Sequence, residues 1–381
     1  MIGVCIRYFN KNYGGMLQAY ATTKFLEKNN INYELIRYKK KKSIMLVFKS
    51  IPRLFNKILI NDKKEQLKKK IGLFFHSEFK KNDRIRSESF EKFISNNFKS
   101  LSPIYYGYKE LSINSSKYSC VLTGSDQLWS PAGLPSNFYN LNFCKEGVKR
   151  VSYASSFGVS YIPWYQKKRT TKFLEKMDYI SVRENTGATI IKKLINKDVP
   201  VVLDPVMLLS KEEWDRYIPT KKIINDKYIF AYFLGKNKKY RDEVIKFSKE
   251  NNLKIVTLKH LDQFVKSDES FGDISLYKIA PDDFLNLIRN ADYIFTDSFH
   301  GSVFSIIYQK KFLTFNRYDE NSKVSKNSRI SSLMKMLEIN RRYNGDINSI
   351  LEEIDYNKLN LLLQNEKEKS IFYLNKALGV D

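Results

Sequence analysis

The sequence predicts an α/β protein built from two doubly wound domains that face each other across a cleft. Three observations lead to this class. Short apolar runs alternate with segments of helical periodicity along most of the chain. The alternating units fall into two blocks, on either side of a polar stretch at 210–226. With 381 residues, the chain is longer than one ordinary hydrophobic core supports. Strands and helices that alternate in this way form parallel sheets with helices on both faces.

The first block, residues 1–215, opens with an expected strand at 2–9, followed by a loop and a helix at about 16–28. Residues 39–100 are rich in Lys and Phe and indicate a helical insertion. The other strands expected in this block are at 32–37, 120–123, 151–154, 179–182 and 199–203.

The second block, residues 222–345, repeats the strand–helix pattern. Pro281, followed by two aspartates, marks a helix start, because proline fits the first turn and acidic side chains favour the positive helix end. Residues 346–381 are expected to form a helical tail that packs back on the domains. The expected strands are at 228–234, 254–258, 293–296 and 312–316, and the helices at 240–250 and 281–289.

The net charge of +25 raises the question of a nucleic-acid partner. The excess is mostly Lys rather than Arg, in a chain also rich in Asn and Ile, which suggests a genome of biased base composition. The charge is also uneven, since residues 37–70 hold 13 Lys or Arg against only Asp62 and Glu65. We therefore expect no nucleic-acid partner. A non-enzymatic basic module remains an alternative, and it would bind its partner with a steep salt dependence.

Within this basic region, residues 39–60 have the pattern of a basic amphipathic helix. Such a helix is typical of proteins that bind an anionic membrane surface, but a core-packed helix with a solvated Lys face fits equally well. We expect no signal peptide at the N-terminus, and no apolar run is long enough to span a bilayer. We expect a cytoplasmic protein that binds the inner face of the plasma membrane peripherally. The apolar positions are Ile44, Phe48, Ile51, Phe55 and Ile58, with Lys49, Arg53 and Lys57 off that face.

The most informative segment is the turn at 297–301, Asp-Ser-Phe-His-Gly. It links a short apolar strand to an apolar helix, so it presents the first N–H groups of that helix at the carboxyl edge of a sheet. Ser298 and Ser302 can donate hydrogen bonds there, Gly301 permits close approach, and His300 adds a group that ordinarily titrates near neutral pH. This pattern predicts an anion site with an acid or base in it. The alternative is that the turn only caps the helix and His300 packs in the core.

The segment Asn12-Tyr13-Gly14-Gly15 follows the first strand and opens the first helix, so its backbone N–H groups are expected to face the cleft. It lacks the spacing of a dinucleotide-binding GxGxxG motif or of a P-loop. The sequence therefore predicts substrate contacts from Asn12, Tyr13 and Gly14 without a nucleotide motif.

Two further strand ends carry candidate binding residues. Asp126 and Gln127, with Trp129 close behind, suit a sugar, which offers C–H faces for stacking and hydroxyls for hydrogen bonds. Asp126 could instead only cap the following turn. Arg183 follows another strand, where a cation suits a carboxylate or phosphate, unless it merely pairs with Glu184.

Six segments that share these turns occur in one order: Asn-Tyr-Gly-Gly-Met-Leu-Gln-Ala-Tyr-Ala (12–21), Gly-Ser-Asp-Gln-Leu-Trp (124–129), Ser-Tyr-Ala-Ser-Ser-Phe-Gly (152–158), Ile-Ser-Val-Arg-Glu (180–184), Leu-Asp-Pro-Val-Met-Leu-Leu (203–209) and Thr-Asp-Ser-Phe-His-Gly (296–301). In kind and order they resemble the motifs of the polysaccharide pyruvyl transferase family, over residues 2 to about 345. The resemblance implies a GT-B-like fold, with an acceptor side at 1–215 and a donor side at 222–345. It also implies transfer of the enolpyruvyl group of phosphoenolpyruvate onto two hydroxyls of a sugar, which gives a cyclic pyruvate ketal.

By motif match, Arg183 and His300 fall at positions that hold or activate the donor, and Arg329 matches a further basic position. Phosphoenolpyruvate is a small anion that needs several fixed donors, and ketal formation needs a group that gives and takes protons. We assign the proton transfer to His300, with Asp126 as a candidate base for an acceptor hydroxyl. No metal or other cofactor is expected beyond phosphoenolpyruvate as co-substrate.

The expected acceptor is a saccharide in a cell-surface polysaccharide precursor, with a polyprenyl diphosphate carrier as one option. The main alternative is a nucleotide-sugar glycosyltransferase on the same fold, which would bind UDP or GDP.

Overall fold

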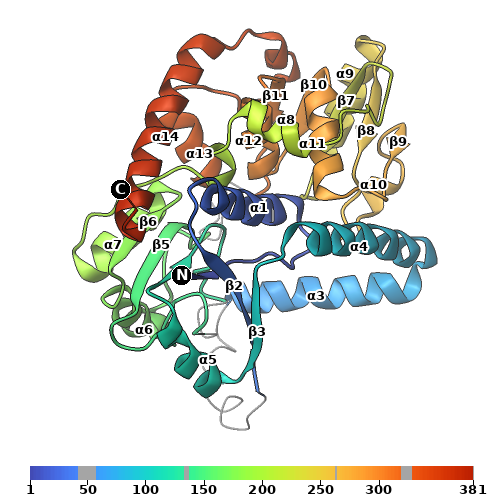
Figure 1. Cartoon of the computed structure of the whole chain (residues 1–381). Coiled ribbons are helices and arrows are strands. Elements are labelled where there is room, and N and C mark those ends of the chain that lie inside the picture. The colour runs from blue at the N-terminus through green and yellow to red at the C-terminus, as the bar shows by residue number, and fades with distance from the viewer. Residues whose placement is uncertain (42–56, 133–136, 262–263, 319–327, 381) are drawn as a thin grey trace.

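The computed structural model describes residues 1–41, 57–132, 137–261, 264–318 and 328–380 (Figure 1). It contains two parallel sheets, one in each half of the chain, and confirms the predicted class of two doubly wound α/β units in a GT-B-like arrangement. The first sheet has the strand order β3-β2-β1-β4-β5-β6 and the second β11-β10-β7-β8-β9. We refer to the elements around these sheets as the N-terminal and C-terminal halves.

The N-terminal half is built on strands that are buried on both faces. In β1 all four residues are buried, as expected for a central parallel strand with helices on each side. Its strands are β1 (Ile2–Cys5), β2 (Tyr33–Lys39), β3 (Leu101–Tyr106), β4 (Cys120–Thr123), β5 (Lys149–Ser155) and β6 (Tyr179–Val182). Its helices are α1 (Tyr13–Lys28), α3 (Lys57–Phe75), α4 (Ser77–Asn97), α5 (Tyr108–Asn114), α6 (Trp164–Leu174) and α7 (Asn185–Ile195).

The C-terminal half follows a short connection that holds the 3-10 helix η4 (Pro205–Met207) and α8 (Lys211–Tyr217). Helix α11 begins at Pro281, as predicted, and Asp283 accepts a hydrogen bond from Ala280 N at its start. The strands are β7 (Tyr228–Tyr232), β8 (Lys254–Thr257), β9 (Ile274–Ser275), β10 (Tyr293–Thr296) and β11 (Lys311–Thr314). The helices are α9 (Lys238–Glu250), α10 (Lys266–Glu269), α11 (Pro281–Asn290), α12 (Phe299–Ile307), α13 (Ser328–Met336) and α14 (Tyr356–Leu378).

Several expected boundaries are wrong. The first strand ends at Cys5 rather than at residue 9, and the helix after it starts at Tyr13 rather than at 16. The strand expected at 199–203 is reduced to a single bridge between Val182 and Val201. Strands β3 and β9 were not predicted, because β3 follows directly on the insertion and β9 is only two residues long.

The insertion at 39–100 contains two long helices, α3 and α4, which lie side by side (Figure 1). Most of the predicted membrane segment at 39–60 lies outside the described residues, which exclude 42–56. In the part of the chain that the structure describes, no helix is long and apolar enough to cross a bilayer.

Helix α14 ties the end of the chain to the N-terminal half (Figure 1). Tyr373 Oη donates to the backbone oxygen of Ser152 on β5 at 2.9 Å, and Ser370 Oγ accepts from Leu203 N at 3.0 Å. The two halves are therefore joined by a helix as well as by the connection before β7.

The strand order reverses between β1 and β4 in the first sheet and between β7 and β10 in the second. In doubly wound sheets, ligands bind beyond the carboxyl ends of the strands at such a reversal. The predicted turns at 12–15, 124–127 and 297–301 follow β1, β4 and β10. The topology thus places them at the two binding edges.

Candidate active site

Two helices, one from each half, begin at the boundary between the halves. Asn12 caps α1 by accepting a hydrogen bond from Gly15 N at 2.9 Å. Ser298 caps α12 in the same way by accepting from Gly301 N at 3.3 Å. Helices α1 and α12 contact each other, so their positive ends lie in one region. Ser298 therefore caps the helix, as the alternative expected, and its predicted role in substrate binding stays a prediction.

The backbone of Gly14 lies directly against the imidazole of His300. A Cβ atom added to Gly14 would lie 2.0 Å from His300 Nδ1 and 2.3 Å from Cγ. Because real Cβ atoms essentially never come closer than 3.0 Å, any larger residue at position 14 must displace this ring. His300 is itself buried, at 6% exposure. Glycine at position 14 thus permits the contact between the two halves.

Arg183, Asp204 and His300 form a buried charged cluster. Arg183 Nη1 donates to Asp204 Oδ2 at 2.5 Å, and His300 Nε2 lies 3.5 Å from the same oxygen. Ser125 Oγ also donates to this oxygen, at 3.0 Å. On its other side, Arg183 Nη2 lies 3.5 Å from Asp126 Oδ1. The structure therefore brings together Asp126, Arg183 and His300, which the sequence placed at three separate strand ends.

Asp204 was missed as a site residue in the sequence, although the signal was present. It stands between an apolar run and Pro205, in one of the six segments that carry the family resemblance. Its Oδ1 accepts from Val206 N at 3.2 Å and so starts the helix η4, while its Oδ2 belongs to the charged cluster. A carboxylate at the exit of an apolar run is the pattern that could have identified it.

The carboxylates of Asp204 and Asp126 stay ionised. Burial alone would raise the pKa of Asp204, but His300 and Arg183 beside it hold that pKa well below its usual range. Burial also acts to raise the pKa of Asp126, but the charges of Arg183, Arg7, His300 and Arg329 together outweigh it, so that this pKa is lowered as well. The cluster therefore contains two fixed negative charges next to one guanidinium and one imidazole.

Arg183 does not serve only as a partner of Glu184. The short contact of its guanidinium is with Asp204, whereas Glu184 Oε1 accepts from Ser156 Oγ at 2.9 Å. Burial raises the pKa of Glu184 despite the nearby charge of Arg183. The structural-pair alternative is wrong for this arginine.

Two arginines lie over the ring of Phe299, with their guanidinium carbons 4.6 Å (Arg183) and 5.7 Å (Arg329) from its centroid. Burial lowers the pKa of Arg329 to about 10. Among the described residues, Nε of both arginines, Nη2 of Arg183 and Nε2 of His300 have no hydrogen-bond partner. Buried donors without partners cost folding free energy, so a group of them in one place fits a site that is completed by an anionic ligand.

The sequence model of the polysaccharide pyruvyl transferase family matches residues 12–319, most of the chain. This chain belongs to that family. It is accordingly a transferase enzyme of polysaccharide pyruvylation. The matched range contains every predicted site residue except Arg329, which lies beyond its end.

A search of curated proteins found no match. Solved structures resemble the chain over nearly its whole length but at low identity. UDP-GlcNAc 2-epimerase from Methanocaldococcus jannaschii is 11% identical, with a TM-score of 0.48 over 97% of this chain and 91% of that chain. The S. aureus MnaA structure with UDP is 12% identical, with a TM-score of 0.49 over 100% and 97%. MurG from Acinetobacter baumannii is 9% identical, with a TM-score of 0.42 over 98% and 93%.

In this pyruvyl transferase family member, Ser302 and Gly301 make contacts within the protein that stabilise the turn at 297–301. Ser302 Oγ donates to Ser298 O at 3.1 Å and lies 2.7 Å from Thr314 Oγ1, so its hydroxyl is satisfied by the protein. A Cβ on Gly301 would lie 2.6 Å from Thr296 Oγ1. Gly301 therefore permits the packing of α12 against β10. These contacts do not support the substrate-binding roles predicted for Gly301 and Ser302.

Trp129 does not provide the predicted surface for sugar stacking. Its side chain is 0% exposed and packs between Phe157 and Phe173, with ring centroids 5.4 Å away in each case. Its Nε1 donates to Tyr139 O at 3.1 Å. The indole is a core residue, whereas Asp126 and Gln127 of the same segment are both half-buried.

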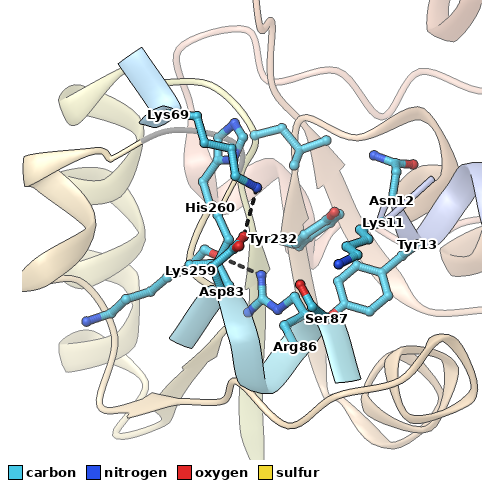
Figure 2. A pocket seen from close by; sticks show the side chains of 12 residues that line it. Lys11, Asn12, Tyr13, Lys69, Asp83, Arg86, Ser87, Tyr232, Lys259 and His260 are labelled. Atoms are coloured by element: carbon cyan, nitrogen blue, oxygen red, sulfur yellow. Dashed lines mark hydrogen bonds and ion pairs between the residues drawn. The ribbon is translucent and has the colours of Figure 1, made fainter. Parts of the chain in front are cut away.

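Tyr13 connects the halves. Its hydroxyl donates to Ile279 O at 3.1 Å, and its ring stacks on Phe284 with centroids 4.8 Å apart. One edge of Tyr13 also lines a hollow formed by both halves (Figure 2). This residue therefore combines a structural contact with a position at the edge of a pocket.

Asn12 and Tyr13, which line the hollow in Figure 2, directly precede Gly14, whose backbone lies against His300 of the charged cluster. The cationic walls of the hollow come from the β1 loop, from α3 and α4, and from the segment after β8. Arg86 donates from Nη1 to Lys259 O at 2.7 Å, and Lys69 Nζ lies 2.8 Å from Asp83 Oδ1. Other lining residues include Lys11, Ser87, Tyr232 and His260.

Proposed function

We propose that this enzyme transfers the enolpyruvyl group of phosphoenolpyruvate onto two hydroxyls of one sugar in a cell-surface polysaccharide precursor. Two C–O bonds form at the central carbon, and the C–O bond to phosphate breaks. One hydroxyl proton ends on the methylene carbon, which becomes a methyl group, and the other leaves with phosphate. The product is a cyclic pyruvate ketal.

The observation that carries this proposal is a set of buried nitrogen atoms on Arg183, Arg329 and His300 that make no hydrogen bond within the described residues, although two of them face carboxylates at 3.5 Å. Two guanidiniums suit the phosphate and carboxylate of phosphoenolpyruvate, since each can donate two parallel hydrogen bonds. The N-terminus of α12 adds a positive helix end on the same side. Such positioned charge stabilises the transition state as the phosphate leaves.

We assign the proton transfer to Nε2 of His300. The ionised carboxylate of Asp204 lies 3.5 Å from this atom and stabilises the imidazolium that forms when the histidine takes up a proton. Asp126, ionised and only half-buried, is placed to accept a proton from an acceptor hydroxyl. Besides phosphoenolpyruvate as co-substrate, we propose no cofactor.

We propose that the acceptor sugar binds at the open mouth of the hollow in Figure 2, because the hollow itself is too narrow to enclose a sugar ring. Its walls offer polar groups, including the half-buried Asn12 and Ser87, for the hydroxyls of the sugar. An acceptor on a polyprenyl diphosphate would bring anionic groups toward Lys11 and Lys69. A carrier of this kind would place the reaction at the cytoplasmic leaflet.

Calorimetry with phosphoenolpyruvate, inorganic phosphate, UDP and GDP tests the donor. We expect phosphoenolpyruvate to bind at least tenfold more tightly than inorganic phosphate, because the carboxylate adds a second charged contact. Equal affinity for the two would contradict the proposal, and tight binding of UDP or GDP would favour the glycosyltransferase alternative. Mass spectrometry of lipid-linked oligosaccharides should then show the gain of one pyruvate ketal.

A further inference from the structure

Helix α3 presents an exposed apolar stripe along its outer side. The stripe consists of Ile60, Leu67, Ile71 and Phe74, which follow one another at spacings of seven, four and three residues. Such spacings place side chains on a single face of a helix. Their exposed fractions are 37%, 57%, 48% and 83%. Leaving four large apolar side chains in water is costly, and a row of them on one helix indicates a binding surface.

Lysines border this stripe on both sides. Lys63, Lys64, Lys68 and Lys70 are all exposed. At 100° per residue, Lys63 and Lys70 fall on one flank of the stripe, and Lys64 and Lys68 on the other. In the described part of α3, no acidic residue lies on the face that carries the stripe and its lysines. Glu65 lies on the other side of the helix.

The opposite side of α3 is held by the rest of the protein, which sets the direction of the stripe. A Cβ on Gly72 would lie 3.1 Å from Phe264 and 3.4 Å from Phe79, so the helix packs closely there. Lys69 points to the same side and pairs with Asp83 of α4 at 2.8 Å. Figure 1 shows α3 on the outer side of α4. The apolar stripe and its lysines therefore face away from the fold.

We infer that the outer face of α3 docks this protein on an anionic lipid surface. Apolar side chains that enter the interface, with lysines at the level of the headgroups, are the pattern of helices that lie in a membrane surface. A second copy of this chain fits less well, because a two-fold contact through α3 would set the same lysines against each other. Each partner would also carry a net charge of +25.

This surface lies on the same helix as Lys69, which lines the hollow of Figure 2. Because Lys69 points away from the stripe, docking through α3 would hold that hollow one helix diameter, roughly 10 Å, from the lipid headgroups. If the proposed function is correct, the enzyme then meets a lipid-linked acceptor at the surface where it is anchored. Membrane binding itself does not depend on which reaction the enzyme catalyses.

Flotation with vesicles tests the inference on the full chain, without donor or acceptor. The parent protein should float with vesicles of equal parts phosphatidylglycerol and phosphatidylcholine, less at high salt, and not with phosphatidylcholine alone. The charge variant Lys63→Glu/Lys64→Glu/Lys68→Glu/Lys70→Glu should lower partitioning by at least about tenfold. The apolar variant Leu67→Ser/Phe74→Ser should lower it comparably while keeping all the charges.

A matched control changes four exposed lysines on α6 and just after it, as Lys167→Glu/Lys168→Glu/Lys172→Glu/Lys176→Glu, and alters the net charge equally. It should bind vesicles as the parent does. If both charge variants lost vesicle binding equally, the binding would depend on the net charge of the protein and not on α3, which would overturn the assignment. Retained binding in the Leu67→Ser/Phe74→Ser variant would overturn it as well. A concentration-dependent dimer of the parent, abolished by that variant, would identify a second copy as the occupant instead.

Discussion

His300 and Arg183, from different halves of the molecule, contact the same carboxylate oxygen, Oδ2 of Asp204. The proposed proton carrier and one proposed anion-binding arginine are thereby held by a single ionised atom. Both side chains are nearly inaccessible to water, at 8% and 1% exposure. Because a buried charge is costly to leave unpaired, Asp204 should affect both stability and catalysis.

The first prediction concerns Asp204→Asn. At neutral pH the variant should lose about 3–5 kcal/mol of unfolding free energy, because it leaves Arg183 buried without its charged partner. The folded-state pKa of Asp204 is depressed, so its contribution is present above the unfolded pKa of about 3.9 and is lost as pH falls toward the folded value. The stability gap to the parent should therefore narrow below about pH 4.

Urea denaturation at neutral and acid pH measures this gap. Asp198→Asn is the control, because Asp198 pairs with Lys192 at an 86% exposed position. If Asp204→Asn does not fold, Ser125→Ala removes one hydrogen bond to the same oxygen and should cost about 1 kcal/mol. A gap that is constant with pH would show that Asp204 is not ionised in the folded state.

The second prediction concerns Gly14→Ala. The added methyl group must displace the His300 ring, so turnover should fall by about 10²-fold or more if that ring transfers the proton. The neighbouring Gly15→Ala is a close control, since its Cβ would meet nothing nearer than 3.5 Å. Steady-state kinetics of both variants test this contact, and equal activities would show that the position of His300 is not critical.

The third prediction concerns His300→Ala, which should lower turnover by about 10²–10⁴-fold, the usual contribution of a positioned acid or base. Binding of phosphoenolpyruvate should weaken far less, because the two arginines remain. His76→Ala, at an exposed position, is the control and should leave turnover unchanged. A variant with near-normal turnover would remove His300 from the mechanism.

The fourth prediction separates the two arginines. Arg329 has no ion pair among the described residues and burial lowers its pKa, so Arg329→Met should retain stability and raise KM for phosphoenolpyruvate by about tenfold or more. Arg183→Met should weaken binding and also destabilise the fold, because it leaves Asp204 unpaired. Thermal unfolding beside kinetics shows the difference. Loss of stability in Arg329→Met with unchanged KM would make Arg329 a structural residue.

The fifth prediction concerns Trp129→Phe. Because the indole is wholly buried and its Nε1 donates to Tyr139 O, the variant should lose about 1–3 kcal/mol of unfolding free energy. KM for the acceptor should stay unchanged. An increase in KM without loss of stability would restore the stacking role that the sequence suggested.

The fold class and the principal turns could be predicted because their signals are local. An apolar run such as Tyr293–Thr296, followed by polar residues and an apolar helix, predicts strand, turn and helix from neighbours in the chain alone. The end of β1 was predicted too late, because apolar residues continue in the chain after the last residue that pairs with a neighbouring strand. Residues 42–56 are not among the residues that the structure describes. The predicted amphipathic helix at 39–60 therefore stays a prediction.

By itself the sequence determined the two-sheet α/β class and the strand-end turns at Gly14, Asp126, Arg183 and His300, and its motifs indicated the family, since all of these depend on residues close together in the chain. Only the tertiary structure decided what those side chains meet. It joined Arg183 to Asp204, set Gly14 against His300 and enclosed Trp129 in the core. These partners come from distant segments and different halves, so packing and burial select them, and no local pattern carries that information.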